Sequence, residues 1–169
     1  MDKYKIIPDG IKDVEFTKRP DPVPYNYRIS YKVAQICLIL DLAVKKGGCS
    51  FQLIQIVATA LTTDFDMIQL KLFIDGKMPD YSIIKYDPAV NYALQFAIAE
   101  KIIIRQKNGN LKLTETGKQY CKLIMRDNSL LVEEKKSLLE LQGKISEDAI
   151  DELRNKWREL NVDYQPPKN

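Results

Sequence analysis

The chain has 169 residues, 45% of them apolar and 29% charged, which fits one globular domain with extensions or two very small domains. Its net charge of +3 is too small to indicate a nucleic-acid-binding protein from composition alone. The sequence contains no histidine, which excludes Ser-His-Asp and Cys-His nucleophile systems within this chain and removes the commonest metal ligand.

The cysteines predict neither a disulfide framework nor a zinc site, because Cys37, Cys49 and Cys121 are odd in number and lack Cys-x-x-Cys spacing. Cys37 and Cys121 lie among apolar residues, which favours buried thiols over reactive ones. Charged residues interrupt any secretory apolar stretch near Met1, and the longest apolar run, residues 33–44, is too short and too polar to span a membrane. We therefore expect a cytoplasmic protein.

Residues 1–29 are expected to form an extended N-terminal arm, because Pro8, Pro20, Pro22 and Pro24 prevent a continuous helix. The aromatic residues of the arm indicate that it packs on something. Two interpretations stay open: the arm packs against its own domain, or it binds a partner.

Three helices are predicted next. Ser30 is expected to cap a helix that runs to about Lys46 and ends at Gly47-Gly48, and Ser50 to cap a helix over residues 51–63 that is apolar nearly all round. A third helix is expected over residues 64–75. The expected inward residues are Val33, Ile36, Cys37, Leu40 and Val44 in the first helix and Phe65, Ile68, Leu72 and Phe73 in the third.

A helix, a β-hairpin and another helix follow. Asp87 caps a helix with Pro88 at its first position, and this helix ends near Glu100. Residues 102–106 and 111–113 flank Asn108-Gly109, the signal for a type I′ hairpin turn. Thr114 is expected to cap a helix that reaches about Arg126.

The C-terminal sequence predicts two more helices. One starts at Asn128 or Ser129 and is ended by Gly143, and the other is capped by Ser146. The order of elements predicts a mainly α fold with a small β-hairpin. In domain terms we expect a winged-helix core over residues 30–126, a C-terminal helical hairpin over 127–160 and a flexible tail over 161–169.

The charge of the helix before the hairpin indicates whether this protein binds DNA. In DNA-binding winged helices that helix enters the major groove, and nearby cations supply most of the affinity through phosphate contacts. Between Lys85 and Lys101 the sequence has no Lys or Arg, although Asn91 and Gln95 are of the type that reads adenine edges. The helix is otherwise apolar, which favours protein contacts.

Charge is distributed unevenly along the chain. Residues 86–126 carry seven cations and three anions, a net charge of +4, whereas residues 127–169 carry seven cations and ten anions, a net charge of −3. The candidate contacts to a DNA backbone are Lys101, Arg105, Lys107 and Lys112. We favour the alternative that these cations form a solvated hairpin edge, where they also discourage edge-to-edge pairing. Any DNA binding is expected to be weak, backbone-directed and strongly salt-dependent.

The acidic C-terminal helices carry more apolar surface than one face of a lone helix needs. The candidate partner-binding residues are Leu130, Leu131, Leu138, Leu139 and Trp157. The alternative is that these residues fold back on the core of their own chain. We expect no catalytic residues, metal or cofactor, because no Gly-rich phosphate loop follows a strand and carboxylate pairs such as Glu133/Glu134 lie in polar surface segments.

Residues 31–63, residues 83–120 and the helical hairpin beyond them resemble the small middle components of bacterial ABC-type three-component defence systems, the group that includes Lamassu-like antiphage operons. The most specific segment is "DPAVNYALQFAIAEKII". The resemblance implies a non-enzymatic winged-helix adaptor between an SMC/Rad50-like ABC ATPase and an effector subunit, often a nuclease. The alternative is a winged-helix transcriptional regulator that binds a palindromic double-stranded DNA site as a homodimer.

Overall fold

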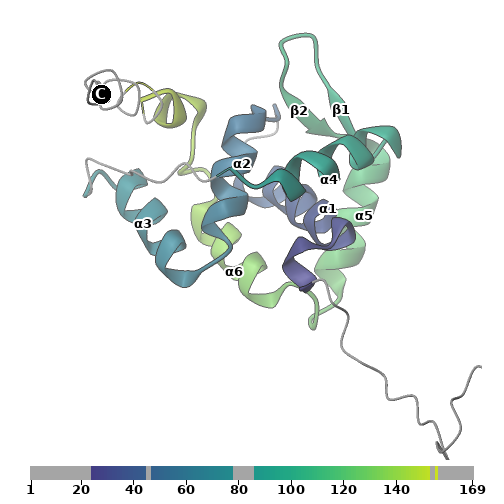
Figure 1. Cartoon of the computed structure of the whole chain (residues 1–169), viewed down its shortest axis with the longest axis horizontal. Coiled ribbons are helices and arrows are strands. Elements are labelled where there is room, and N and C mark those ends of the chain that lie inside the picture. Colours follow the sequence, from purple (N-terminus) through teal and green to yellow (C-terminus); the bar gives the residue numbers. More distant parts are fainter. Residues whose placement is uncertain (1–23, 45–46, 78–85, 153–154, 156–169) are drawn as a thin grey trace, which may run out of the picture.

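The computed structural model describes residues 24–44, 47–77, 86–152 and 155, and these form a mainly helical fold with one two-stranded antiparallel sheet (Figure 1). Most of the predicted N-terminal arm, the tail and Trp157 lie outside the described residues. In chain order, the elements are η1 (Tyr25–Tyr27), α1 (Ile29–Leu38), η2 (Ile39–Ala43), α2 (Phe51–Ala60), α3 (Asp64–Ile74), α4 (Pro88–Ala99), β1 (Ile103–Arg105), β2 (Leu111–Leu113), α5 (Glu115–Arg126) and α6 (Val132–Leu141).

Helix α1 is the centre of the core and packs against α4, α5, α6 and η2. Every residue from Lys32 to Ala43 is buried except Asp41. The predicted cap was wrong: Arg28 occupies the N-cap position and Ser30 lies inside α1, because the 3₁₀ turn η1 leads the chain directly into the helix. The expected continuous helix also changes at Ile39 into the π-helix η2, which is wider than an α-helix.

Helix α2 begins as predicted, with the Ser50 hydroxyl accepting a hydrogen bond from Leu53 N at 3.1 Å. Helix α3 packs on α2, and the predicted inward face was wrong at Phe65 and Ile68, which are exposed, and correct at Phe73, which is buried. Apolar residues occur on all sides of α3, so helical spacing alone did not define its buried face. The buried apolar residues of α3 are Met67, Leu70 and Phe73.

Helix α4 has the predicted start, with Pro88 at its first position and Asp87 Oδ1 accepting a hydrogen bond from Ala89 N at 2.9 Å. Its end is a Schellman motif. Ile102 N donates to Ala97 O at 2.8 Å, and Lys101, which donates to Ile98 O, has a φ of +56°. This turn directs the chain from α4 into β1.

The β-hairpin pairs Ile103 with Leu113 and Arg105 with Leu111. The predicted type I′ turn was wrong, because within the loop only Gly109 has a positive φ, and type I′ needs two such residues. Gly109 N donates to Gln106 O at 2.9 Å, so the loop is a type I turn followed by a glycine bulge.

The other edge of β2 pairs with a single residue, Cys49, through hydrogen bonds of 3.1 Å and 2.7 Å to Leu111. Gly48, which precedes it, has a φ of +85°, and a β-carbon there would lie 2.3 Å from Leu111 O. Only glycine therefore allows the chain to pass β2 this closely.

Helix α5 is capped by Thr114, as predicted, through a 3.1 Å hydrogen bond from Gly117 N. Helix α6 begins later than predicted, because Leu131, with a φ of +49°, precedes it and the Asp127 carboxylate holds Ser129 in a turn. Helix α6 packs against η2 and α1, and the helical turn over residues 147–152 follows with Ile150 buried. The C-terminal elements therefore complete the core that α1 begins.

Candidate interaction surfaces

The outer face of α4 is uncharged and partly aromatic. Val90, Ala93, Leu94 and Ala97 face the core, whereas the opposite side exposes Tyr92 to 63% and Phe96 to 48%. Gln95 and Ala99 are also exposed on this side, and residues 88–99 contain no charged side chain. The sequence predicted the lack of cations but did not single out Tyr92. We call the exposed residues Tyr92, Gln95, Phe96 and Ala99 the α4 face.

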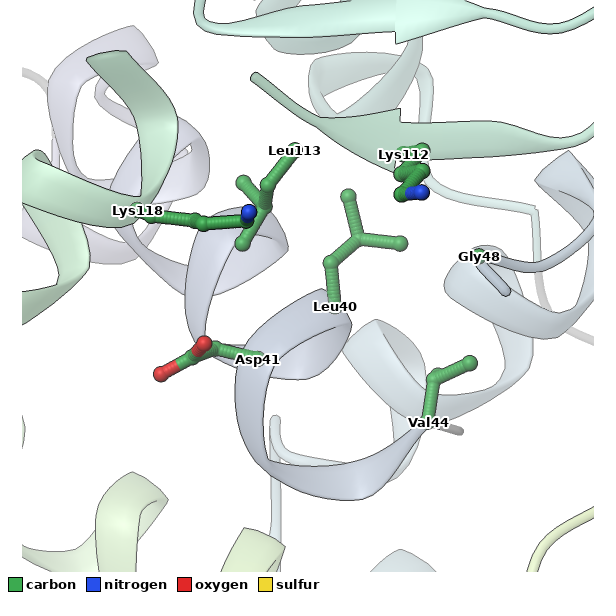
Figure 2. Close-up of a pocket in the computed structure, with 7 residues that line it drawn as sticks. All are labelled: Leu40, Asp41, Val44, Gly48, Lys112, Leu113 and Lys118. Atoms are coloured by element: carbon green, nitrogen blue, oxygen red, sulfur yellow. The ribbon is translucent and has the colours of Figure 1, made fainter. Parts of the chain in front are cut away.

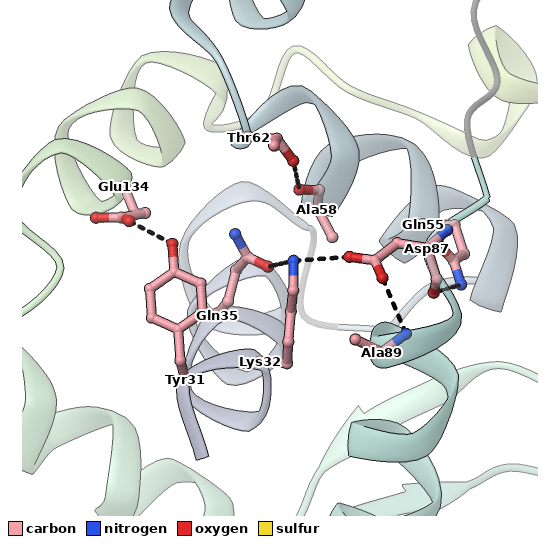
Figure 3. Close-up of polar contacts among 9 residues, drawn as sticks. All are labelled: Tyr31, Lys32, Gln35, Gln55, Ala58, Thr62, Asp87, Ala89 and Glu134. Atoms are coloured by element: carbon pink, nitrogen blue, oxygen red, sulfur yellow. Dashed lines mark hydrogen bonds and ion pairs between the residues drawn. The ribbon is translucent and has the colours of Figure 1, made fainter. Parts of the chain in front are cut away.

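A polar network holds the start of α4 against α1 and α2 (Figure 3). Lys32 Nζ lies 2.8 Å from Asp87 Oδ2 and donates to Gln35 Oε1 at 3.3 Å. Gln55 binds both backbone groups of Asp87: its amide nitrogen donates to Asp87 O at 3.1 Å and its oxygen accepts from Asp87 N at 3.2 Å. The α4 face is therefore presented by a helix that is anchored at its N-terminal end.

The aromatic character extends beyond the N-terminal end of α4. Tyr27 and Tyr86 are both exposed, and together with Pro88 and the ion pair of Lys32 and Asp87 they line a cavity of about 230 Å³. Tyrosine is enriched in protein interfaces because its ring buries apolar area while its hydroxyl remains hydrogen-bonded.

A hydrogen bond also joins α6 to α1: the Tyr31 hydroxyl donates to Glu134 Oε1 at 2.6 Å (Figure 3). Burial raises the pKa of Tyr31 far above its usual value, and the hydrogen bond to Glu134 and the charge of that carboxylate raise it further. The Tyr25 ring meets the Tyr31 ring edge-on at a centroid distance of 5.3 Å. The contacts of Tyr31 therefore serve the packing of α6 on α1.

The four candidate DNA contacts do not form one surface. Arg105 pairs with Leu111 and Lys112 with Ile104, so their side chains project to opposite faces of the hairpin. Lys101 lies in the turn after α4 and Lys107 in the hairpin loop. Lys112 is half-buried, and the other three are exposed.

The candidate partner-binding leucines are also divided. Leu138 is fully buried and faces the core together with Leu141, one helical turn away, so at this position the leucine folds back on its own chain and is not a partner contact. Leu131 is partly buried against the same core, whereas Leu130 and Leu139 are exposed.

The described cysteines are buried free thiols. Burial, followed by the nearby charge of Glu147, raises the pKa of Cys49 to about 12. The contact with Cys37 and burial raise the pKa of Cys121 well above its usual value. Thiols held in the protonated form are poor nucleophiles and poor metal ligands. Within the described residues, no group of three or more Cys, Asp or Glu side chains is arranged to hold a metal ion.

None of the helices in the described part of the chain combines the length and apolar character that crossing a membrane requires. Comparison with models of known protein families, with curated proteins and with solved structures gives no match.

Proposed function

We propose that this chain is a non-enzymatic adaptor with a winged-helix core that binds a partner protein through the α4 face. The winged-helix assignment is supported by the order of the elements: α1, the single-residue strand at Cys49, α2, α4 and then the hairpin of β1 and β2. Helix α3 is an additional helix between α2 and α4. In this assignment the hairpin is the wing and α4 occupies the position of the recognition helix.

The uncharged, aromatic α4 face is the observation that carries the proposal. A recognition helix that enters DNA needs cations close to the phosphates, and residues 88–99 contain none. The centre of a protein interface has the opposite composition, with tyrosine and phenylalanine enriched and charged residues depleted. Tyr92 and Phe96 lie one helical turn apart on an anchored helix, so they provide adjacent anchors for a partner.

The partner that we propose follows from the resemblance to the middle components of three-component defence systems. It is an SMC/Rad50-like ABC ATPase, with an effector subunit, often a nuclease, as the second partner. In this arrangement the ATPase supplies nucleotide hydrolysis and the effector supplies the toxic chemistry. The chain described here contributes binding surfaces.

The test is co-expression of the tagged chain with the products of its neighbouring genes, followed by size-exclusion chromatography with light scattering at moderate salt. A stable complex with a coiled-coil ATPase is the expected result. Replacing Tyr92 and Phe96 together by serine is expected to abolish the complex, because truncation of a hot-spot residue at the centre of an interface costs about 2 kcal/mol or more.

The matched control replaces Phe65 and Ile68 by serine, since these side chains are similarly exposed on α3. The control is expected to retain the complex. If the control and the α4 variant assemble equally well, the α4 face is not the binding surface. If the wild-type chain elutes alone as a homodimer, the adaptor proposal fails and selection of duplex DNA sites becomes the next experiment.

A further inference from the structure

A cavity of about 450 Å³ lies between η2, β2 and the first turn of α5 (Figure 2). Its apolar lining comes from Leu40 and Val44 at the η2 side and from Leu113 of β2. Figure 2 shows the Leu40 side chain at the centre of the view, facing the strand. Such a volume with an apolar floor fits one aliphatic side chain together with the backbone on either side of it.

The backbone around the cavity has two unusual features. The π-helix η2 places Leu40 and Asp41 at the cavity, and short π-helical segments frequently occur at functional sites. Gly48 also lines it, and a side chain at this position would meet the backbone of Leu111. The opening between η2 and β2 is therefore formed by backbone geometry as well as by side chains.

The rim of the cavity carries more positive than negative charge. Lys112 of β2 and Lys118 of α5 lie on either side of Leu40, and Asp41 of η2 lies on the same side as Lys118 (Figure 2). Among the described residues Lys112 and Asp41 make no ion pair, and Lys118 pairs with the exposed Glu115 at 2.7 Å. Exposed pairs of this kind are weak, so Lys118 exchanges partners readily.

These features together define the chemistry of the occupant. A DNA backbone would meet the two lysines, but the apolar floor formed by Leu40, Val44 and Leu113 would offer nothing to a phosphate. A peptide segment with an aliphatic side chain beside a carboxylate matches both the floor and the rim.

We propose that this cavity binds one aliphatic side chain from an acidic segment of a partner protein, with carboxylates on either side of that residue facing Lys112 and Lys118. The inference rests on the proposed adaptor function and extends it, because an adaptor needs a second binding surface. None of the residues that line the cavity belongs to α4.

The probe for the test is the synthetic peptide acetyl-Glu-Glu-Leu-Glu-Glu-amide, titrated into the full chain with ¹³C-labelled methyl groups. The methyl resonances of Leu40, Val44 and Leu113 are expected to shift and to saturate. Replacing Lys112 and Lys118 together by glutamine is expected to weaken the peptide about 10-fold. The matched control, glutamine at Lys101 and Lys107, changes two cations outside the cavity and is expected to leave the affinity within about two-fold.

Two further ligands separate the alternatives. A peptide with serine in place of the leucine, and one with lysines in place of the glutamates, are both expected to leave the three methyl resonances unshifted. The inference is overturned if the acidic leucine peptide shifts none of them, or if a short DNA duplex shifts the Leu40 and Leu113 resonances and the peptide does not.

The co-expression experiment distinguishes this inference from the adaptor function. If the chain forms a stable complex with an ATPase but binds no peptide in the cavity, the proposal for the cavity is rejected and the proposed adaptor function is retained. Peptide binding in a chain that forms no complex with its neighbouring gene products would support the cavity and reject the adaptor function.

Discussion

Lys32 Nζ lies 2.8 Å from Asp87 Oδ2, and this ion pair joins the buried helix α1 to the first turn of α4. The Lys32 side chain is only 3% exposed and that of Asp87 17%. A charge this deeply buried requires its partner, because the energy lost on leaving water must be recovered within the protein. The pair therefore positions α4 and, with it, the α4 face.

Replacing Asp87 by serine is expected to lower the free energy of unfolding by about 3–5 kcal/mol, because it leaves Lys32 buried without its carboxylate. Serine still caps α4, so loss of the cap does not contribute. The double variant Lys32→Met with Asp87→Ser is expected to regain most of this loss. Urea denaturation followed by circular dichroism measures all three proteins.

The control for the buried pair is Glu115→Gln, which breaks the exposed ion pair with Lys118 and is expected to cause no measurable change. If Asp87→Ser is as harmless as this control, or if the double variant is less stable than Asp87→Ser alone, the ion pair does not hold α4 in place.

The left-handed backbone conformation of Lys101 predicts that replacing this residue by glycine stabilises the protein. Lys101 has a φ of +56° in the turn after α4, where glycine is the preferred residue. Lys101→Gly is expected to raise the free energy of unfolding by about 0.5–1 kcal/mol, because relief of the left-handed strain exceeds the entropy that glycine adds to the unfolded chain. The adjacent substitution Glu100→Gly removes no such strain, since the φ of Glu100 is −76°, and it is expected to destabilise the protein in the same thermal melts.

The elements that the sequence predicted correctly depend on local interactions. Ser50, Asp87 and Thr114 each cap a helix through a backbone N–H two or three residues away, so a short stretch of sequence contains the whole interaction. The hairpin strands were also predicted, because their apolar residues flank a loop with turn-forming residues.

The features that the sequence did not predict depend on distant contacts. The burial of Lys32 requires Asp87 from another helix, and which of the adjacent residues Leu138 and Leu139 is buried depends on how α6 packs against η2. The change from α-helix to π-helix at Ile39 has no local signal that separates it from a continuous helix. The α4 face was partly predictable, since the missing cations were visible in the sequence, but the exposure of Tyr92 depends on which side of α4 packs against α1.

The raised pKa of the buried Cys49 thiol predicts that the free energy of unfolding falls at alkaline pH. Its pKa is raised from the usual 9.0 to about 12 in the folded protein, so the unfolded chain releases this proton first. The contribution of the protonated Cys49 thiol to the free energy of unfolding is complete below a pH of about 9. It is lost as the pH rises towards about 12, at up to about 1.4 kcal/mol per pH unit. Between about pH 8 and about pH 10.5 the wild type is expected to lose about 2 kcal/mol more than Cys49→Ala.

Urea denaturation at the two pH values measures this difference, and comparison with Cys49→Ala removes the contributions of other groups, such as Tyr31, whose pKa is also raised. Equal losses in the wild type and in Cys49→Ala would show that the thiol of Cys49 does not titrate differently in the two states.

The positions of the hairpin cations limit any binding to double-stranded DNA. Because Arg105 and Lys112 project to opposite faces, one duplex contacts at most part of the set. We expect weak binding with similar affinity for unrelated sequences. Glutamine at Arg105 and Lys107 is expected to reduce the slope of log affinity against log salt by about 1.8, or about 0.9 for each phosphate contact removed.

Fluorescence anisotropy with two duplexes of unrelated sequence over a range of salt concentrations measures both properties. The matched control, glutamine at the exposed Lys136 and Lys144, removes the same charge from the C-terminal part and is expected to keep the wild-type slope. Affinity that differs by more than about 1000-fold between two sequences would be that of a specific regulator, since specific binding exceeds nonspecific binding by at least this factor. In that case Gln95, on the exposed side of α4, would become the first candidate for base recognition, and the α4 face would lose its assignment to a protein partner.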